Sequence, residues 1–254
     1  RSPSRGLGDV YKRQALRLLS PSPLADGAFE LALSDGWAFV FGGDAVDKGG
    51  AVGGSIRVAR TLIRLKRTYP DRVTLLIGNR DANKIRISSE LTEAQLAHSR
   101  LASTPGPYWV PEQKRVSPAA YLANSHAHAR PAGAPQPTAA ELCAVNTLAN
   151  RIRWMLKETM GADGEFERRR RELAALGCGA VDEDDPDYVE MPTDTDVCRS
   201  FIDSVAEGGF MRELLLLGQL AVIIGPNLFV HGGLHNPHAV SYTHLRAHET
   251  DSYL

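Results

Sequence analysis

The chain has 254 residues, of which 43% are hydrophobic and 23% are charged, and its formal net charge is -1 at pH 7. This composition is typical of a globular protein with one large domain, or with one domain that carries an insertion. The small net charge gives no electrostatic case for nucleic acid or an anionic membrane as a partner, and no apolar run reaches the roughly 18 residues of a membrane span.

The two ends of the chain are interpreted as foreign to the protein. A single DNA string encodes SRGLGDVYKRQ (residues 4–14), and its reverse complement, read in another frame, encodes VSYTHLRAHE (residues 240–249). Two unrelated protein segments should almost never be related in this way, and the string resembles a transposase-type sequencing adapter. We therefore assign residues 1–14 and 240–254 to translated adapter and base the functional prediction on residues 15–239.

The first predicted elements form a βαβ unit. Residues 37–41 (WAFVF) make a short continuous apolar run that is closed by Gly-Gly-Asp, as a buried strand would be. Between residues 55 and 69 apolar side chains recur at helical spacing while arginines lie mostly on the other side, and residues 73–78 (VTLLIG) predict the next strand. Ligands bind at the carboxyl ends of parallel strands, so we expect a site in the loops that follow these two strands.

Residues 88–210 are predicted to form a helical insertion or cap. A T-x-x-E capping box at residues 138–141 precedes an apolar pattern that predicts one helix up to Gly161. Residues 165–177 predict another helix with its own glycine stop. The acidic stretch 181–190 repeats no known ligand spacing, which favours a solvated loop over a metal-binding loop.

Two further strands are predicted after one or two more helices. LAVIIG (220–225) and LFVHGG (228–233) are apolar runs joined by a Gly-Pro-Asn turn sequence, and His231 lies at the end of the second run.

Three predicted strand ends present polar groups: GDAVDKG (43–49), GNRD (78–81) and HGG (231–233). Aspartate, asparagine and histidine supply oxygen and nitrogen ligands for divalent ions such as Mn, Fe or Zn. The flanking glycines let the backbone approach a ligand closely. Turn chemistry explains each motif alone equally well, but the three together, in this order and each at a strand end, predict a metal site.

The segments GDAVDKG, GNRD and LFVHGG resemble the GDxxDRG, GNHE and HGG motifs of PPP-type serine/threonine protein phosphatases, within the calcineurin-like metallophosphoesterase superfamily. The GNRD-x-NK variant is also similar to a less characterised eukaryotic branch of calcineurin-like phosphoesterases. The resemblance implies an α/β fold, a metallophosphoesterase-type β-sandwich flanked by helices and truncated at both ends. It assigns residues 15–87 and 211–239 to the metallophosphoesterase domain and residues 88–210 to a large helical insertion.

The resemblance implies a role for each matching residue. Asp44 would bridge two divalent metal ions, with Mn, Fe or Zn expected, and Asn79 and His231 would ligate the second ion. Asp47 is the second acid of the first motif. Lys48 stands where the family has a phosphate-contacting arginine, so it would bind substrate with its charge but without a bidentate fork.

Arg80 departs from the family pattern, because it stands where the family has a histidine that pairs with the second acid and assists the leaving oxygen. An arginine cannot donate a proton at ordinary pH, but it can pair with a carboxylate and stabilise developing negative charge. We expect the Arg80 guanidinium to lie within about 4 Å of the Asp47 carboxylate, or to face the phosphate site. Asp47 and Arg80 are therefore the candidate catalytic residues, and Arg80 is also a candidate for binding substrate.

Two of the family's ligand positions have no match. An Asp-x-His motif on the preceding strand has no counterpart between Ala15 and Asp35, and a later metal-binding histidine would lie beyond His231. His235 and His238 are too near the HGG turn to fill that place. The chain is therefore predicted to be a fragment of an enzyme, without part of the two-metal site.

The leading hypothesis is a metal-dependent phosphatase that hydrolyses phosphomonoesters with a metal-activated water, with phosphoserine and phosphothreonine among the candidate substrates. One alternative is a dinucleoside polyphosphate hydrolase, since such enzymes share these motifs, and another is a non-catalytic phosphatase-like binding module. The expected partner is a phosphorylated protein or small molecule. Three separated cysteines without a CxxC pair favour reduced thiols, so we expect an intracellular, cytoplasmic protein.

Overall fold

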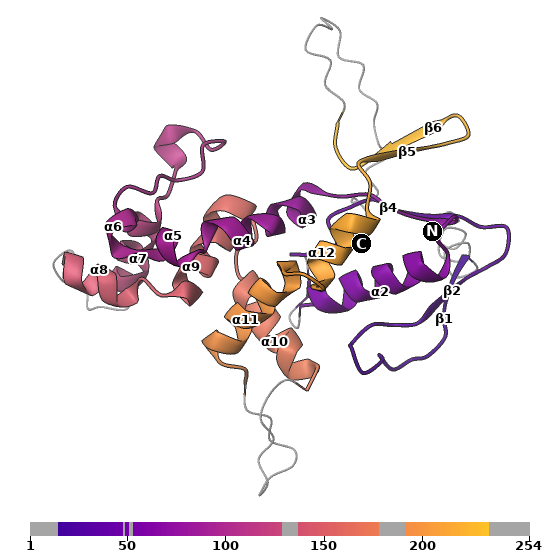
Figure 1. The fold of residues 1–254 in the computed structure, drawn as a ribbon, viewed down its shortest axis with the longest axis horizontal. Coiled ribbons are helices and arrows are strands. Elements are labelled where there is room, and N and C mark those ends of the chain that lie inside the picture. Colours follow the sequence, from indigo (N-terminus) through magenta and orange to yellow (C-terminus); the bar gives the residue numbers. More distant parts are fainter. Residues whose placement is uncertain (1–14, 48, 51–52, 129–136, 178–190, 234–254) are drawn as a thin grey trace, which may run out of the picture.

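A computed structural model describes residues 15–47, 49–50, 53–128, 137–177 and 191–233 (Figure 1). Helices account for about 51% and strands for about 12% of the structure, so the chain is of mixed α/β class, as predicted. Within the described ranges the strands form small two-stranded sheets rather than a closed barrel. None of the helices in these ranges has the length and apolar character that crossing a membrane requires.

The strands are short and lie near the two ends of the described chain. β1 (Leu16–Leu18) pairs antiparallel with β2 (Leu31–Leu33), β3 (Phe39–Phe41) pairs in parallel with β4 (Val73–Leu75), and β5 (Ala221–Ile224) pairs antiparallel with β6 (Asn227–Val230). The β5–β6 hairpin turns at Gly225, whose φ of 57° suits glycine. The predicted pair of C-terminal strands is therefore confirmed.

The predicted βαβ unit is also confirmed. α2 (Ser55–Thr68) connects β3 to β4, whose register aligns Phe39 with Val73 and Phe41 with Leu75. Because the two strands are parallel, the loops that follow them lie at the same edge of the sheet. These loops carry the GD and GN motifs.

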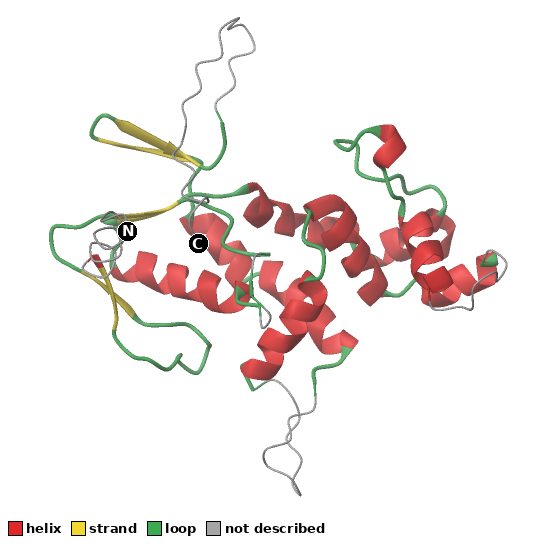
Figure 2. Ribbon diagram, turned by 180° about the vertical axis from the view of Figure 1, so that it is seen from behind, coloured by secondary structure: helices red, strands yellow, loops and turns green. Residues whose placement is uncertain are grey.

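The C-terminal hairpin reaches the same edge through a short parallel bridge between Leu76 and Gln219. The Gln219 N–H donates to the Leu75 carbonyl at 2.9 Å, and the Ile77 N–H donates to the Gln219 carbonyl at 3.0 Å. Figure 2 shows the hairpin beside the strand pair and away from the main group of helices. His231 comes directly after β6, so this bridge places it near the loops after β3 and β4.

Helices occupy most of the chain between the two strand regions, as predicted for residues 88–210. They are α3 (Asn79–Asn83), η1 (Lys84–Arg86), α4 (Ile87–Glu90), α5 (Glu93–Leu96), α6 (His98–Leu101), η2 (Glu112–Lys114), α7 (Pro118–His128), α8 (Ala139–Val145), α9 (Leu148–Trp154), the π-helical turn η3 (Met155–Thr159), α10 (Glu165–Ala175), α11 (Asp194–Val205) and α12 (Phe210–Leu217).

The single helix predicted between the capping box and Gly161 is wrong in its middle. The capping box of Thr138 and Glu141 is present, but α8 ends at Asn146, and the Thr147 side chain caps α9 instead. Asparagine and threonine side chains offer the backbone alternatives to helical hydrogen bonds, which explains the break. The Asn146 amide also donates to the Leu96 carbonyl at 2.9 Å, a tertiary contact that the local pattern does not reveal.

The helical region and the βαβ unit share one hydrophobic core. Its buried side chains include Ile63 of α2, Val73 of β4, Phe166 of α10 and Phe201 of α11. The helices that follow α3 thus pack against the same apolar residues that cover the parallel strands. This shared core fixes the position of α10 relative to the loops at the strand ends.

Asp194, the first residue of α11, joins three helices by pairing with Arg153 of α9 at 2.9 Å and with Arg170 of α10. The hydrogen bonds from Arg153, together with those from Arg170, lower the pKa of Asp194 from its ordinary value of 3.8 to about 2. A carboxyl group whose pKa is lower in the folded state stabilises the fold above its unfolded pKa, and this stabilisation is lost as the pH falls through the folded pKa.

We predict that Asp194→Asn lowers the free energy of unfolding above about pH 4, and that its difference from the wild type disappears as the pH falls from 3.8 to about 2. The difference should stay below about 1 kcal/mol, because the pair is partly exposed and screened by solvent. Urea denaturation of both proteins at several pH values between 2 and 6 measures it. A difference that grows on acidification would contradict the assignment.

Candidate metal centre

The loop after β3 holds its two aspartates in an unusual backbone conformation. Gly43 has a φ of 93°, Asp44 of 58° and Asp47 of 70°. Residues other than glycine are uncommon in this left-handed region, persist there only when the surrounding structure holds them, and cluster at functional sites. The conformation of this loop therefore depends on its contacts.

The buried carboxylate of Asp81 provides the main contacts. It accepts the Asp44 N–H at 2.8 Å, the Ala45 N–H at 2.8 Å and the Gly78 N–H at 2.9 Å. Burial raises the pKa of Asp81, against the backbone hydrogen bonds, which lower it. Asp81 thus joins the loop after β3 to the loop after β4. Its membership of the GNRD motif was the only signal in the sequence, and no role was predicted for it.

Two glycines allow three chain segments to meet. A Cβ atom on Gly78 would lie 2.3 Å from the Asp44 backbone nitrogen, and a Cβ atom on Gly43 would lie 2.5 Å from Nδ1 of His231. Both distances are too short for any side chain, so glycine permits the close approach of these chain segments.

The three predicted metal ligands are brought together by this approach. His231 Nε2 lies 3.3 Å from Asp44 Oδ1 and 3.3 Å from Asn79 Oδ1. His231 Nδ1 lies 2.7 Å from the Gly42 carbonyl oxygen. Since a carbonyl oxygen only accepts, Nδ1 donates in this contact, and Nε2 is the ring nitrogen that faces the two side-chain oxygens.

This arrangement fits a divalent cation. One ring nitrogen and two side-chain oxygens face one another, and a cation among them would be bound by all three once Nε2 carries no proton. The described residues contain no group of three or more His, Cys, Asp and Glu that could hold a metal. The third donor in the arrangement above would be the amide oxygen of Asn79. The donor set therefore suits one ion of the Mn, Fe or Zn type.

The expected pairing of Arg80 with Asp47 is wrong. Arg80 Nε lies 3.4 Å from Asp44 Oδ2, Arg80 Nη1 donates to the Gly161 carbonyl at 3.0 Å, and the Arg80 backbone N–H donates to Asp44 Oδ1 at 3.1 Å. Arg80 lies in the first turn of α3 beside Asp44, whereas the Asp47 carboxylate is buried and has another partner. Arg80 therefore balances the charge of Asp44.

The partner of Asp47 is Lys84, which the sequence did not reveal as a site residue. Both side chains are buried, and Lys84 Nζ donates to Asp47 Oδ2 and lies 3.5 Å from Sδ of Met160. Burial raises the pKa of Asp47 and lowers that of Lys84, and the charge of each partner opposes the shift of the other. The carboxylate of Asp47 is therefore buried against Lys84.

Several predicted features lie outside the described residues. These are Lys48, the acidic stretch 181–190, His235, His238 and the adapter-like termini.

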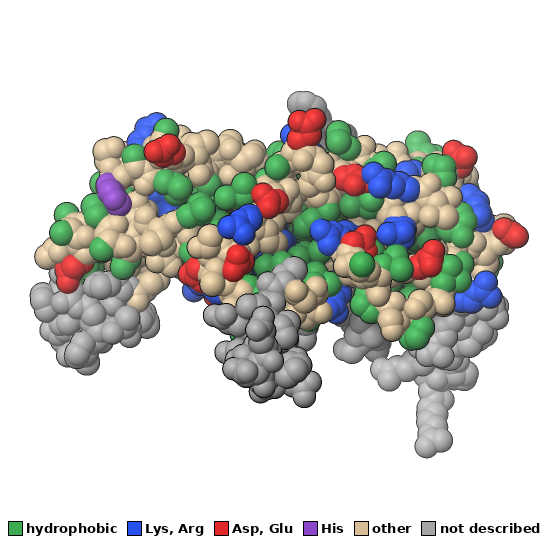
Figure 3. All heavy atoms as spheres, turned by 60° about the horizontal axis from the view of Figure 1, so that its bottom comes forward, with side chains coloured by type: hydrophobic (Ala, Val, Ile, Leu, Met, Phe, Trp, Pro, Cys, Tyr) green, Lys and Arg blue, Asp and Glu red, His purple; other side chains and the backbone are tan. Residues whose placement is uncertain are grey.

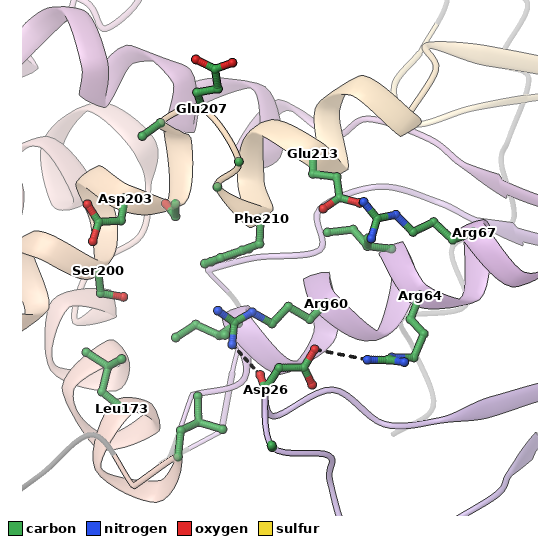
Figure 4. A pocket seen from close by; sticks show the side chains of 18 of the residues that line it. Asp26, Arg60, Arg64, Arg67, Leu173, Ser200, Asp203, Glu207, Phe210 and Glu213 are labelled. Carbon is green, nitrogen blue, oxygen red and sulfur yellow. Dashed lines mark hydrogen bonds and ion pairs between the residues drawn. The ribbon is translucent and has the colours of Figure 1, made fainter.

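A separate hollow of about 870 Å³ lies between α2 and the segment that joins α11 to α12 (Figure 4). The predicted metal ligands are not among its lining residues. Two of its three arginines are ion-paired, Arg64 at 3.4 Å from Asp26 and Arg67 at 2.7 Å from Glu213, and the third, Arg60, donates to the Asp26 carbonyl. On the face shown in Figure 3, basic and acidic side chains are interspersed, so this face has no extended patch of one sign.

Comparison of the chain with protein-family models, with curated proteins and with solved structures finds no match to any of them.

We predict that Gly78→Ala destabilises the protein by about 1–3 kcal/mol, the usual effect of inserting a methyl group into a filled site. The φ of Gly78 is -86°, so alanine would meet no backbone strain and only the contact with Asp44 matters. Gly42→Ala is the matched control, because a Cβ atom there meets nothing within 4 Å. Equal urea midpoints for the two variants would show that the loops do not approach as closely as described.

Proposed function

We propose that the chain carries part of the catalytic site of a calcineurin-like, PPP-type metallophosphatase that hydrolyses phosphomonoesters. The observation that carries the proposal is the convergence of Asp44, Asn79 and His231, which come from three separate segments and meet with 3.3 Å separations. The three segments have the order of the family motifs and resemble them in local sequence, apart from Lys48 and Arg80. Asp44 supplies the only negative charge among the three donors.

The fold that we propose is the metallophosphoesterase-type β-sandwich flanked by helices. The parallel β3–β4 pair and the parallel bridge between Leu76 and Gln219 support it, since they bring the start of the β5–β6 hairpin beside the strands that carry the first two motifs. α2 packs against both β4 and α12, so helices flank these strands.

A divalent ion held by Asp44, Asn79 and His231 would supply a water of lowered pKa as the nucleophile and a positive charge for phosphate oxygens. The protein's own contribution is to orient its ligands: the Gly42 carbonyl fixes the tautomer of His231, and Asp81 fixes the backbone of Asp44. Arg80 adds a fixed positive charge beside Asp44 that suits an anionic substrate. It has no proton to give, so aryl phosphates with good leaving groups should be better substrates than alkyl phosphates.

A non-catalytic binding module is the second candidate, and one observation favours it. Arg80 already lies 3.4 Å from Asp44 Oδ2, so that carboxylate has a cationic partner without a metal. A module of this kind would bind phosphate groups through Arg80 and would not turn them over.

We predict that Mn²⁺ binds the chain at one site per molecule and that Asp44→Asn weakens this binding by more than about 100-fold. Loss of a residue that only hydrogen-bonds a metal ligand weakens metal binding by up to about 100-fold, and loss of a ligand itself should weaken it more. The fully exposed Asp35 gives the matched control Asp35→Asn, which should bind Mn²⁺ like the wild type. Titration calorimetry measures both affinities.

Hydrolysis of an aryl phosphate, where present, should be abolished by a chelator and by Asp44→Asn.

These measurements separate the candidates. Mn²⁺ binding with chelator-sensitive phosphate release supports the phosphatase, whereas phosphate binding without Mn²⁺ binding supports the binding module. Equal Mn²⁺ affinities for wild type and Asp44→Asn would refute the proposed centre.

We predict opposite effects of Arg80→Ala on the two ligands. Removing a positive charge 3.4 Å from Asp44 should strengthen Mn²⁺ binding several-fold and weaken the binding of inorganic phosphate. Arg80→Lys, which keeps the charge, should change both affinities less. Unchanged affinities in the alanine variant would mean that Arg80 does not act on the centre.

A further inference from the structure

The loop of Asp44 is connected to the helical region by a buried hydrogen-bonded chain. The Asp47 N–H donates to Ser55 Oγ at 3.1 Å, and the Ser55 hydroxyl donates to Glu165 Oε1 at 2.7 Å. All three residues are at most 4% exposed. The Ser55 hydroxyl has a single proton and gives it to Glu165, so its orientation is fixed and its lone pair is directed at Asp47.

Glu165 is itself held in place. Its second carboxylate oxygen accepts Arg168 Nε at 2.8 Å. In the same helix, the Glu172 carboxylate accepts the backbone N–H groups of Ile56 and Arg57 at 3.2 and 3.0 Å. Residue Gly54 before α2 has no side chain to cap that helix, so α10 supplies the cap from outside.

A second connection reaches the carboxylate of the same aspartate. Lys84, on η1, donates to Asp47 and lies against Met160, and the next residue, Gly161, accepts a hydrogen bond from Arg80. The short segment from Met160 to Glu165 therefore contacts Lys84, Arg80 and Ser55, each of which also contacts Asp44 or Asp47.

These buried charged groups are costly to desolvate, and an apolar core of the same shape is often as stable or more stable. We therefore expect these groups to matter for the position of the backbone rather than for overall stability. The Asp47 backbone has a φ of 70°, which is maintained only by surrounding contacts.

We propose that Ser55 and Glu165 are positioning residues, which transmit the fixed position of α10 to the loop of Asp44 and so hold that aspartate toward Asn79 and His231. The metal-binding consequence rests on the proposed function, whereas the effect on the loop does not. The helical region then helps to position the ligands of the centre and does more than cover it.

The test compares two buried serines. Ser55→Ala removes the link, whereas Ser204→Ala removes a hydroxyl of similar burial that bonds only the Phe201 carbonyl of its own helix. We expect Ser55→Ala to speed hydrogen exchange of the Asp47 amide and to weaken Mn²⁺ binding by about 10-fold or more. This is the usual loss of metal affinity when a residue that supports a metal ligand is removed. Ser204→Ala should change neither the exchange rate at Asp47 nor the Mn²⁺ affinity, even if it lowers the free energy of unfolding as much as Ser55→Ala does.

A second pair of variants guards against a failure to fold. Glu165→Gln and Glu167→Gln each remove one charge from the first turn of α10, where each glutamate bridges an arginine three residues on, but only Glu165 bonds Ser55. Only Glu165→Gln should affect exchange at Asp47 and Mn²⁺ affinity.

Two outcomes would overturn the proposal: wild-type exchange at Asp47 in Ser55→Ala, or an equal loss of Mn²⁺ affinity in both serine variants. If the wild type binds no Mn²⁺, the proposed function fails, and exchange at Asp47 in the four variants still decides whether Ser55 and Glu165 position the loop.

Discussion

The described structure around the centre depends on one carboxylate. Asp81 accepts backbone N–H groups of Asp44 and Ala45 after β3 and of Gly78 after β4, and so fixes two loops against each other. Three hydrogen bonds to one buried charged group are stronger than three between neutral groups, and a lost acceptor would leave buried donors unpaired. The left-handed φ of Asp44 persists because these bonds hold it.

The glycines determine how close the third segment can come. Gly43 leaves room for the His231 ring, and Gly78 leaves room for Asp44, so three strand ends meet without a clash. The hydrogen bond between His231 and the Gly42 carbonyl then orients the ring. The packing of the backbone at these glycines therefore determines where the three loops lie, and the positions of the donor side chains depend on it.

Charge is balanced locally on both sides of the loop. Arg80 lies beside Asp44, and Lys84 lies beside Asp47. Each aspartate thus has its own cation: the side chains of the first pair are 21% and 16% exposed, whereas those of the second pair are buried. The helical region takes part in both pairs, because Gly161 accepts from Arg80 and Met160 contacts Lys84.

Local sequence was sufficient for the elements that local physics determines. The βαβ unit, the capping box at Thr138, the α10 helix and the C-terminal hairpin follow from apolar periodicity, capping side chains and turn residues, which act within a few positions. The meeting of Asp44, Asn79 and His231 was also predicted, from the order of the three motifs and their resemblance to a family.

The pairing of buried charges was decided by tertiary structure alone. Asp47 and Lys84 are 37 positions apart, and Ser55 and Glu165 are 110 apart. The sequence shows which residues carry charge, but burial decides which of them must find a partner, and burial depends on how the helical region packs against the strands. For this reason the sequence alone assigned Arg80 to the wrong aspartate and assigned no role to Asp81, Lys84 or Glu165.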